Sequence, residues 1–330
     1  MKTVILGTGS WGTALGQVLA DNGNEVVMYG IESSEVEDLN QNHRNSRYFD
    51  AQVNEAIHAT MDIQCVEDAD VVLLAVPVVA IESMARKVSE LIKKPAIIVT
   101  VAKGFHPVTH ERMSVVIEKE VNKGRKLPVV SLIGPSHAEE VILRKLTAVN
   151  AVCADDGAAK TIQELFSNDY FRVYRNNDVI GAEIGVAIKN VIAIASGILH
   201  GIGQGDNARA ALMTRGLAEI TRFGVAMGGK KETYLGLDGV GDLIVTCSSR
   251  HSRNFMAGYQ IGKDGGAERF LRENNKTVEG VLACKVVYEE ARKNGIDMPI
   301  TEQVYKILYE NESPQAAIVS LMRRDLKPES

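Results

Sequence analysis

The 330-residue chain has too few suitably spaced cysteines and histidines to build a disulfide framework or a metal centre. Its four cysteines lie far apart and form no C-x-x-C pair, and its seven histidines never fall at a metal-ligand spacing such as H-E-x-x-H. We therefore predict reduced thiols and no metal site.

The chain also lacks an excess of positive charge and a long apolar segment. The net charge is -5 and the pI is near 5.9, which argues against nucleic acid as the main partner. No run approaches the ~20 apolar residues of a membrane span. Glycines interrupt the apolar start, Val4–Leu6, before it reaches the length of a signal peptide. These absences predict a cytoplasmic protein that does not insert into a membrane.

The first thirty residues carry the clearest pattern in the chain. Gly7, Gly9 and Gly12 follow the apolar run at G-x-G-x-x-G spacing, and a helical pattern and a second strand at 25–29 come next. In a dinucleotide site, Gly7 permits the tight turn, Gly9 lets the pyrophosphate approach, and Gly12 lets the helix pack on the strand. The order of elements favours such a site over a glycine-rich turn without a ligand.

Three further apolar runs, 70–76, 96–101 and 129–133, have the form of strands that are buried on both faces. Helical patterns separate them, and this alternation predicts an α/β fold with a Rossmann-type doubly wound parallel sheet. The ligand crevice of such a sheet lies at the carboxyl ends of the strands. Lys103, Gly134 and Ser136 follow these strands, so we expect them beside the nicotinamide ring.

The pattern changes near residue 180, where long helical stretches replace strands. The stretch 181–199 is apolar on all sides, as in a buried helix, and helical patterns follow at 208–227, 279–293 and 300–309. We predict an N-terminal dinucleotide-binding domain, 1–178, and an all-helical C-terminal domain, 179–330, that carries the substrate site.

Lys189 lies in the middle of that apolar stretch, and lysine is rarely buried without a purpose. A desolvated ammonium has a lowered pKa and serves as an acid or base near neutrality. Asp242 follows a glycine-rich loop and Thr246 comes one helical turn later, so we expect their oxygens to point the same way. The alternatives are a lysine stem that reaches solvent and an aspartate that caps a helix.

The segment Ser252-Arg253-Asn254 places a cation and two neutral donors within one turn. The guanidinium fork of arginine matches two oxygens of a phosphate, so we interpret this segment as a phosphate site. The alternative is a solvated run of charges.

Across essentially its whole length the chain resembles the bacterial NAD(P)-dependent sn-glycerol-3-phosphate dehydrogenases. Members of that family reduce dihydroxyacetone phosphate and so supply glycerol 3-phosphate for phospholipid synthesis. The motifs that carry the resemblance are Gly7–Ala14, Ala102–Gly104, Ile133–Ser136, Lys189–Ala193, Asn207–Arg209, Gly241–Leu243 and Ser252–Asn254.

The resemblance also implies roles for individual residues and a homodimer formed through the helical domain. It implies that Lys189 is the proton acceptor, and we place Asp242, Lys103 and Thr246 with it as catalytic residues. The implied substrate contacts are Lys103, Gly134, Ser136, Lys189, Asp242, Ser252, Arg253 and Asn254. The cofactor residues that we assign are Gly7, Gly9, Ser10, Trp11, Gly12, Ile31, Lys103, Ala138, Arg253, Thr277 and Glu279.

The chain departs from the family pattern after its second strand, where members that use NADP usually carry arginine or histidine. Here Ile31 and Glu32 take those places, and an acid at this offset commonly accepts hydrogen bonds from the adenosine ribose. We expect both NAD and NADP to be used, with NADH preferred. Arg44 or Arg47 could reverse this preference by meeting the 2′-phosphate.

Two other functions fit the layout. The hydroxyisobutyrate and 6-phosphogluconate dehydrogenases also join a Rossmann domain to a helical domain with a lysine, but the segment Ser252–Asn254 favours a glycerol phosphate. A regulator that senses a dinucleotide keeps the fold without turnover. Such a regulator has no need of a buried lysine, an acid and a phosphate site together.

Overall fold

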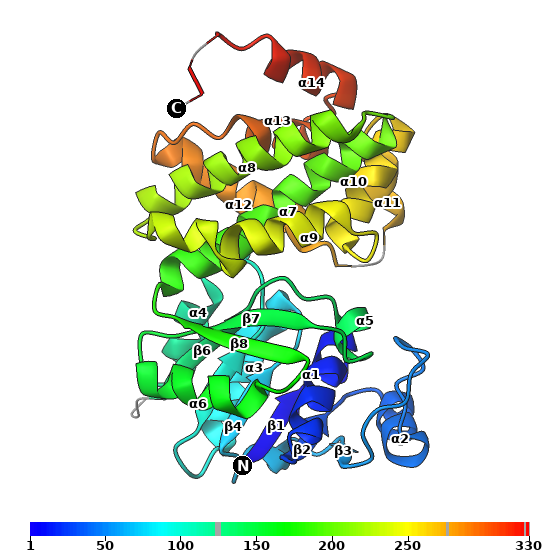
Figure 1. Ribbon diagram of the computed structural model, residues 1–330, viewed down its shortest axis with the longest axis vertical. Coiled ribbons are helices and arrows are strands. Elements are labelled where there is room, and N and C mark those ends of the chain that lie inside the picture. The colour runs from blue at the N-terminus through cyan, green and yellow to red at the C-terminus, as the bar shows by residue number, and fades with distance from the viewer. Residues whose placement is uncertain (123–126, 275–276, 327, 330) are drawn as a thin grey trace. The chain divides into compact units, whose positions relative to one another are not determined.

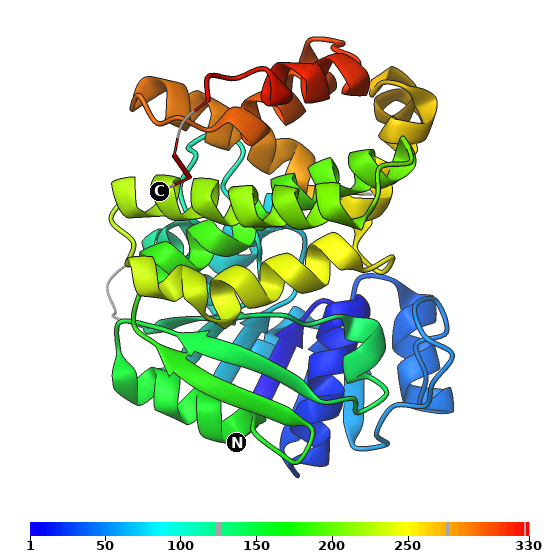
Figure 2. The ribbon, with the colours of Figure 1, turned by 45° about the horizontal axis from the view of Figure 1, so that its top comes forward.

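The computed structural model describes residues 1–122, 127–274, 277–326 and 328–329. The chain divides into two compact units, Met1–Glu183 and Ile184–Ser330 (Figures 1 and 2). The first unit contains all the strands of the described residues, and the second contains helices. Each unit is built around its own core.

The first unit is organised by an eight-stranded sheet in the order β3-β2-β1-β4-β5-β6-β7-β8. The pairs from β3 to β6 are all parallel, and β7 pairs antiparallel with β6. The strands are β1 Lys2–Leu6, β2 Glu25–Tyr29, β3 Ile57–Thr60, β4 Val71–Leu74, β5 Ile97–Thr100, β6 Val129–Ile133, β7 Thr147–Val152 and β8 Phe171–Asn176. The predicted Rossmann-type doubly wound sheet is confirmed.

The antiparallel strand β7 is a difference from the all-parallel sheet that we expected. A parallel return needs a crossover that covers the length of the strand, usually a full helix. Only α5, the single turn Ala138–Val141, lies between β6 and β7, so the chain turns back beside β6. The strands β3, β7 and β8 were not predicted from the sequence, because they are less continuously apolar than the central strands.

Helices cover both faces of the sheet because the central strands are buried on both sides (Figure 1). Ile5 packs in a cluster with residues of α1 and α6, whereas its neighbours Val4 and Leu6 pack with residues of α3 and α4. Side chains alternate across a strand, so each face receives its own core. The full helices of this unit are α1 Ser10–Asp21, α2 Ser33–Asn42, α3 Val78–Leu91, α4 Met113–Val121 and α6 Asp156–Phe166.

The second unit is built around α7, Val179–Gly201, which begins in the last residues of the first unit. A glycine from each of α8, α10 and α12, namely Gly216, Gly258 and Gly280, lies against α7. The helices after α7 are α8 Asp206–Ala226, α9 Asp242–Ser248, α10 Arg253–Asp264, α11 Glu268–Glu273, α12 Glu279–Lys293, α13 Pro299–Tyr309 and α14 Pro314–Met322.

The helix α7 corrects one expectation from the sequence. It is 23 residues long and apolar enough to cross a membrane by length and composition, although we expected no such segment. Its most apolar window is 89% buried inside the protein, as in the core helix of a globular unit. We therefore assign α7 to the core of the second unit.

A buried carboxylate joins α8 to α13 within this unit. The Glu219 side chain is 2% exposed, and its oxygens accept hydrogen bonds from the backbone N–H of Ile300 at 2.5 Å and of Thr301 at 3.2 Å. Glu219 therefore satisfies donors at the start of α13 that the helix itself leaves unpaired. Burial raises the pKa of Glu219 to about 7, although these hydrogen bonds act in the opposite direction.

This pKa makes the stability of the protein depend on pH. Between about pH 4.5, the ordinary value, and about pH 7, folded Glu219 keeps a proton that the unfolded chain releases. Stability should therefore fall by about 3 kcal/mol as the pH rises through this window. Urea unfolding across the window should show the decline in the wild type and lose it in Glu219→Gln. The matched variant Glu232→Gln, at an exposed residue, should keep the decline. An unchanged pH profile in Glu219→Gln would contradict the assignment.

Candidate functional site

The glycine turn of the first unit has the geometry of a pyrophosphate cradle. Gly7 has φ +122°, a conformation that favours glycine, and its N–H donates to the Tyr29 carbonyl at 2.9 Å. A Cβ at Gly12 would lie 2.3 Å from the Gly7 carbonyl oxygen, so a larger residue would push α1 off the turn. A Cβ at Gly9 would meet nothing within 4 Å, which leaves open space at this end of α1.

The start of α1 also fits an anionic ligand. Gly9 is the N-cap of α1, with no side-chain capping bond and no acidic residue in the first turn. The first helical N–H groups and the helix dipole therefore favour a phosphate there. Ser10 and Trp11 open the helix, and Trp11 Nε1 is buried without a hydrogen-bond partner among the residues that the structure describes. These features fit the pyrophosphate of a dinucleotide.

The end of β2 differs from the simplest expectation. Ile31 is 72% exposed, and Glu32, which precedes α2, is also exposed. The buried acid is instead Glu35, one turn into α2 and 5% exposed. Glu35 accepts a hydrogen bond from the Thr8 hydroxyl at 2.5 Å, inside the glycine turn. Glu35 was not predicted from the sequence, because the offset from Gly12 favours Glu32.

The residues expected at the carboxyl ends of β5 and β6 lie together. Lys103 Nζ donates to the Gly134 carbonyl at 3.2 Å, and the Ser136 hydroxyl donates to the same carbonyl at 2.9 Å. Gly134 has φ +147°, and a Cβ there would lie 2.9 Å from the Val149 backbone of β7. Ala138 opens the short helix α5 directly afterwards. An ammonium and a hydroxyl thus meet at the edge of the sheet where ligands bind.

Lys189 is buried in α7 and does not reach solvent. Its side chain is 5% exposed, and Nζ donates to Asp242 Oδ1 at 2.9 Å and to Thr246 Oγ1 at 2.6 Å. The Thr246 hydroxyl gives its own proton to the Asp242 carbonyl at 2.6 Å, so its lone pairs face the ammonium. The structure brings these three side chains together as the sequence analysis expected.

The local structure explains how Asp242 reaches the lysine. A π-helical turn, Leu237–Gly241, precedes Asp242, which is the first residue of α9. Turns of this kind are frequent at functional sites because they shift the register of the following side chain. Gly241 is the N-cap of α9, so Asp242 does not cap this helix and its carboxylate faces Lys189.

The surroundings of this pair are buried. Cys247 follows Thr246 and is 1% exposed. Burial raises the pKa of the Cys247 thiol to about 12, although the nearby Lys189 charge opposes this rise. The thiol is therefore neutral, and an ion pair in so dry a region exerts a strong electrostatic effect on an adjacent group.

The proposed phosphate segment has structural bonds that the sequence did not indicate. The Ser252 hydroxyl caps α10 by accepting from the Phe255 N–H at 3.1 Å. Asn254 is 8% exposed; its amide donates to Asn190 Oδ1 at 3.0 Å and accepts from the Gly280 N–H at 2.8 Å. Asn254 thus links α10 to α12 and to Asn190, the residue after Lys189.

Arg253 is the member of this segment that faces solvent. Its Nη1 donates to the Thr277 carbonyl at 3.3 Å, just before Glu279 opens α12. The guanidinium is therefore held at the start of α12 while it stays accessible to a ligand. Contacts of all these residues with substrate or cofactor stay predictions.

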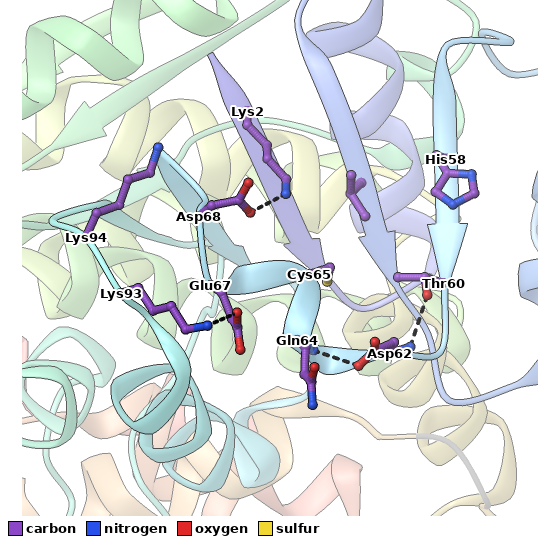
Figure 3. Close-up of a pocket in the computed structure, with 11 residues that line it drawn as sticks. Lys2, His58, Thr60, Asp62, Gln64, Cys65, Glu67, Asp68, Lys93 and Lys94 are labelled. Carbon is purple, nitrogen blue, oxygen red and sulfur yellow. Dashed lines mark hydrogen bonds and ion pairs between the residues drawn. The ribbon is translucent and has the colours of Figure 1, made fainter.

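A groove of about 710 Å³ on the first unit lies apart from the glycine turn (Figure 3). Its lining includes Lys2, Lys93 and Asp68. Lys2 pairs with Asp68 and Lys93 pairs with Glu67, as the dashed lines show. Because these ammonium groups already have acidic partners, the groove offers no positive field for a phosphorylated ligand.

The fold and the residues described above define a class: a dinucleotide-binding oxidoreductase with a Rossmann unit and a helical unit. Comparisons with known proteins identify the family. The model of the NAD-dependent glycerol-3-phosphate dehydrogenase N-terminus matches residues 2–159, and the model of the C-terminus matches residues 178–319. The chain belongs to the NAD-dependent glycerol-3-phosphate dehydrogenase family.

Individual relatives agree with this assignment. The chain is 46% identical to a glycerol-3-phosphate dehydrogenase (NAD(P)+) of Exiguobacterium, over 99% of this chain and 97% of the relative. It is 47% identical to that of Enterococcus faecalis, over 100% of this chain and 97% of the relative. The crystal structure of a glycerol-3-phosphate dehydrogenase from Coxiella burnetii superimposes with a TM-score of 0.91 at 35% identity, over 98% of this chain and 99% of that one.

Proposed function

We propose that the chain interconverts dihydroxyacetone phosphate and sn-glycerol 3-phosphate, with NAD or NADP as the redox cofactor. The observation that carries this proposal is the buried Lys189, hydrogen-bonded to Asp242 and Thr246 within a family of glycerol-3-phosphate dehydrogenases. A buried ammonium with fixed partners is suited to proton transfer. The relatives named above are glycerol-3-phosphate dehydrogenases that use NAD(P)+.

In the proposed mechanism, Lys189 takes the proton of the C2 hydroxyl when the alcohol is oxidised and returns it when the ketone is reduced. A nicotinamide dinucleotide, when bound at the glycine turn, would supply or accept the hydride. Asp242 and Thr246 each accept a hydrogen bond from Lys189 Nζ, and this fixes the direction of its remaining position. That position carries the lone pair when the neutral amine takes the proton, and an N–H bond when the ammonium returns it. Lys103 and Ser136 are proposed to contact the substrate from the edge of the sheet.

Arg253 is proposed to bind the phosphate of the substrate, with Ser252 and Asn254 fixing the turn that presents it. This anchor holds the reacting carbon, so glycerol and dihydroxyacetone should be very poor substrates. The structural bonds of Ser252 and Asn254 support this division of roles, because both side chains are buried while the guanidinium is exposed.

We predict that Arg253→Lys raises the KM for dihydroxyacetone phosphate at least tenfold, because an ammonium cannot reproduce the two parallel hydrogen bonds of the fork. The matched control is Arg250→Lys, at an exposed arginine three residues earlier, which should behave as the wild type. Steady-state kinetics with varied substrate and saturating cofactor measures the effect. An Arg253→Lys enzyme with wild-type efficiency would place the phosphate elsewhere.

We also propose a localisation, an oligomeric state and a metabolic role for the enzyme. We propose a cytoplasmic homodimer that supplies glycerol 3-phosphate for phospholipid synthesis, with a functional boundary at residue 178/179. The start of the C-terminal family model at residue 178 supports this boundary. Ile31 and Glu32 provide no cation for a 2′-phosphate, which supports a preference for NADH.

One absorbance assay tests the function. Purified protein should oxidise NADH with dihydroxyacetone phosphate and should form no NADH from NAD+ with 3-hydroxyisobutyrate or 6-phosphogluconate. Turnover with either of the last two substrates would favour a related hydroxyacid dehydrogenase. Dinucleotide binding without turnover of any of these substrates would favour a sensor.

A further inference from the structure

A buried carboxylate lies where β2 ends beside the glycine turn. Glu35 is 5% exposed, and its Oε2 accepts from the hydroxyl of Thr8, the residue between Gly7 and Gly9. Gly30, the residue after β2, packs against the same threonine, since a Cβ there would lie 2.6 Å from Thr8 Cγ2. In a Rossmann unit this corner receives the adenosine ribose of the dinucleotide.

The second oxygen of this carboxylate holds an arginine. Arg47 Nη1 lies 2.7 Å from Glu35 Oε1, and the Tyr48 hydroxyl lies 3.4 Å from the same oxygen. The Arg47 side chain is 60% exposed while that of Glu35 is 6% exposed, so the guanidinium covers the acid and faces solvent. A cation is therefore present at this corner, although it comes from a segment after α2 and not from the end of β2.

The segment that carries Arg47 is fixed to the glycine turn. Asn45 is 1% exposed, and its amide donates to the Thr8 carbonyl at 2.7 Å and to the Thr13 hydroxyl at 2.9 Å. Asn45 thus holds the backbone two residues before Arg47 against both the turn and α1. The backbone that carries the Arg47 side chain is therefore held in place by these hydrogen bonds.

We propose that Glu35 sets the cofactor selectivity of this enzyme by holding and neutralising Arg47 beside the adenosine ribose. A ribose with a free 2′-hydroxyl meets a neutral ion pair at this corner. A 2′-phosphate has to compete with the Glu35 carboxylate for the guanidinium and is repelled by that carboxylate. The ion pair therefore favours NAD over NADP. The inference rests on the proposed function only in that the chain binds a nicotinamide dinucleotide.

Trp11 provides a test that does not depend on turnover. It is the only tryptophan in the chain and opens α1 in the glycine turn, so its fluorescence reports dinucleotide binding. Titration with NAD+ and with NADP+ gives the ratio of the two dissociation constants. The variant Glu35→Gln keeps an oxygen for the Thr8 hydroxyl and removes the charge that neutralises Arg47.

We expect Glu35→Gln to shift this ratio at least tenfold toward NADP+. The double variant Glu35→Gln/Arg47→Ala should lose the shift, because the freed cation is gone. The matched control Glu37→Gln, at an exposed glutamate two residues later on α2, should leave the ratio unchanged. Ile31→Arg is a positive control that adds a cation at the end of β2 and should also move the ratio toward NADP+.

The single variant Arg47→Ala tests the same idea at an exposed residue. It leaves the Glu35 charge unpaired beside the ribose, so the ratio should shift further toward NAD+. Equal losses of affinity for both dinucleotides in Glu35→Gln would give Glu35 a structural role only and overturn the proposal, as would an unchanged ratio in Arg47→Ala. A shifted binding ratio in protein without turnover would retain this inference and reject the proposed function.

Discussion

Replacing Lys189 with alanine should lower kcat for the reduction of dihydroxyacetone phosphate at least a hundredfold while dinucleotide binding stays at the wild-type level. A positioned proton donor of this kind contributes about 10² to 10⁴ in rate. Lys189 belongs to the second unit and Trp11 to the first. The fluorescence of Trp11 therefore measures dinucleotide binding from the unit that does not carry the substitution. Steady-state rates of dihydroxyacetone phosphate reduction give kcat, and Trp11 fluorescence titrations give the affinity for the dinucleotide. A variant that retains a tenth of wild-type turnover would remove Lys189 from the mechanism.

The main alternative explanation of such a loss is a destabilised second unit. Removing Lys189 leaves the Asp242 carboxylate buried without its cation, and breaking a buried pair in this way costs about 3–5 kcal/mol. The double variant Lys189→Met/Asp242→Asn removes both charges and keeps the volume. It should unfold near the wild-type urea concentration and remain as inactive as Lys189→Ala. Recovery of activity in the double variant would show that stability, not proton transfer, caused the loss.

Several residues of this site could be predicted because the patterns that indicate them are local in the sequence. Lys189 stood out as a charge within a helix that is apolar on all sides, and Asp242 and Thr246 were paired by their spacing of four residues. The glycine turn could be predicted equally well, since strand, turn and helix follow one another without interruption. In each case the pattern that singles out the residue lies within a few positions along the chain, whereas the contact of Lys189 with Asp242 joins residues 53 positions apart and was expected from the family resemblance.

Contacts between distant segments could not be predicted in this way. Glu35 and Arg47 belong to segments on either side of the end of α2, and nothing in their spacing shows that Glu35 meets Thr8 in the glycine turn and pairs with Arg47. No pattern in the sequence indicated the bonds of Asn254 to Asn190 and Gly280, and its contact with a phosphate stays a prediction. The direction of β7 likewise depends on how the short connection packs, not on the apolar pattern of the strand.

The close packing of α7 on α10 also could not be predicted from the sequence. This packing holds Lys189 of α7 and Arg253 of α10, two residues of the proposed substrate site. Gly197 of α7 faces α10, where a Cβ would lie 2.0 Å from the Phe255 carbonyl oxygen. Gly258 of α10 faces α7 in return, where a Cβ would lie 2.0 Å from the Ile194 carbonyl oxygen. The two backbones therefore touch at these glycines. Gly197 lies eight residues after Lys189 on α7, and Gly258 lies five residues after Arg253 on α10.

Gly258→Ala should consequently destabilise the second unit strongly. Alanine ordinarily stabilises a helix by about 1 kcal/mol relative to glycine, so any loss measures the packing. The added methyl group meets backbone atoms of Ile194, which cannot rotate away, and α10 has to separate from α7. We expect a loss of about 3 kcal/mol and a lower kcat/KM, because Arg253 moves with α10 while Lys189 stays on α7.

Urea unfolding followed by circular dichroism measures the loss, and Gly266→Ala is the matched control. Gly266 lies just after the end of α10, and a Cβ there would meet nothing within 4 Å. This variant should unfold at the wild-type urea concentration and keep full activity. If Gly258→Ala is as stable as Gly266→Ala, the two helices do not approach as closely as the structure shows. The close contact of α7 and α10 would then not be what holds Arg253 and Lys189 within one site.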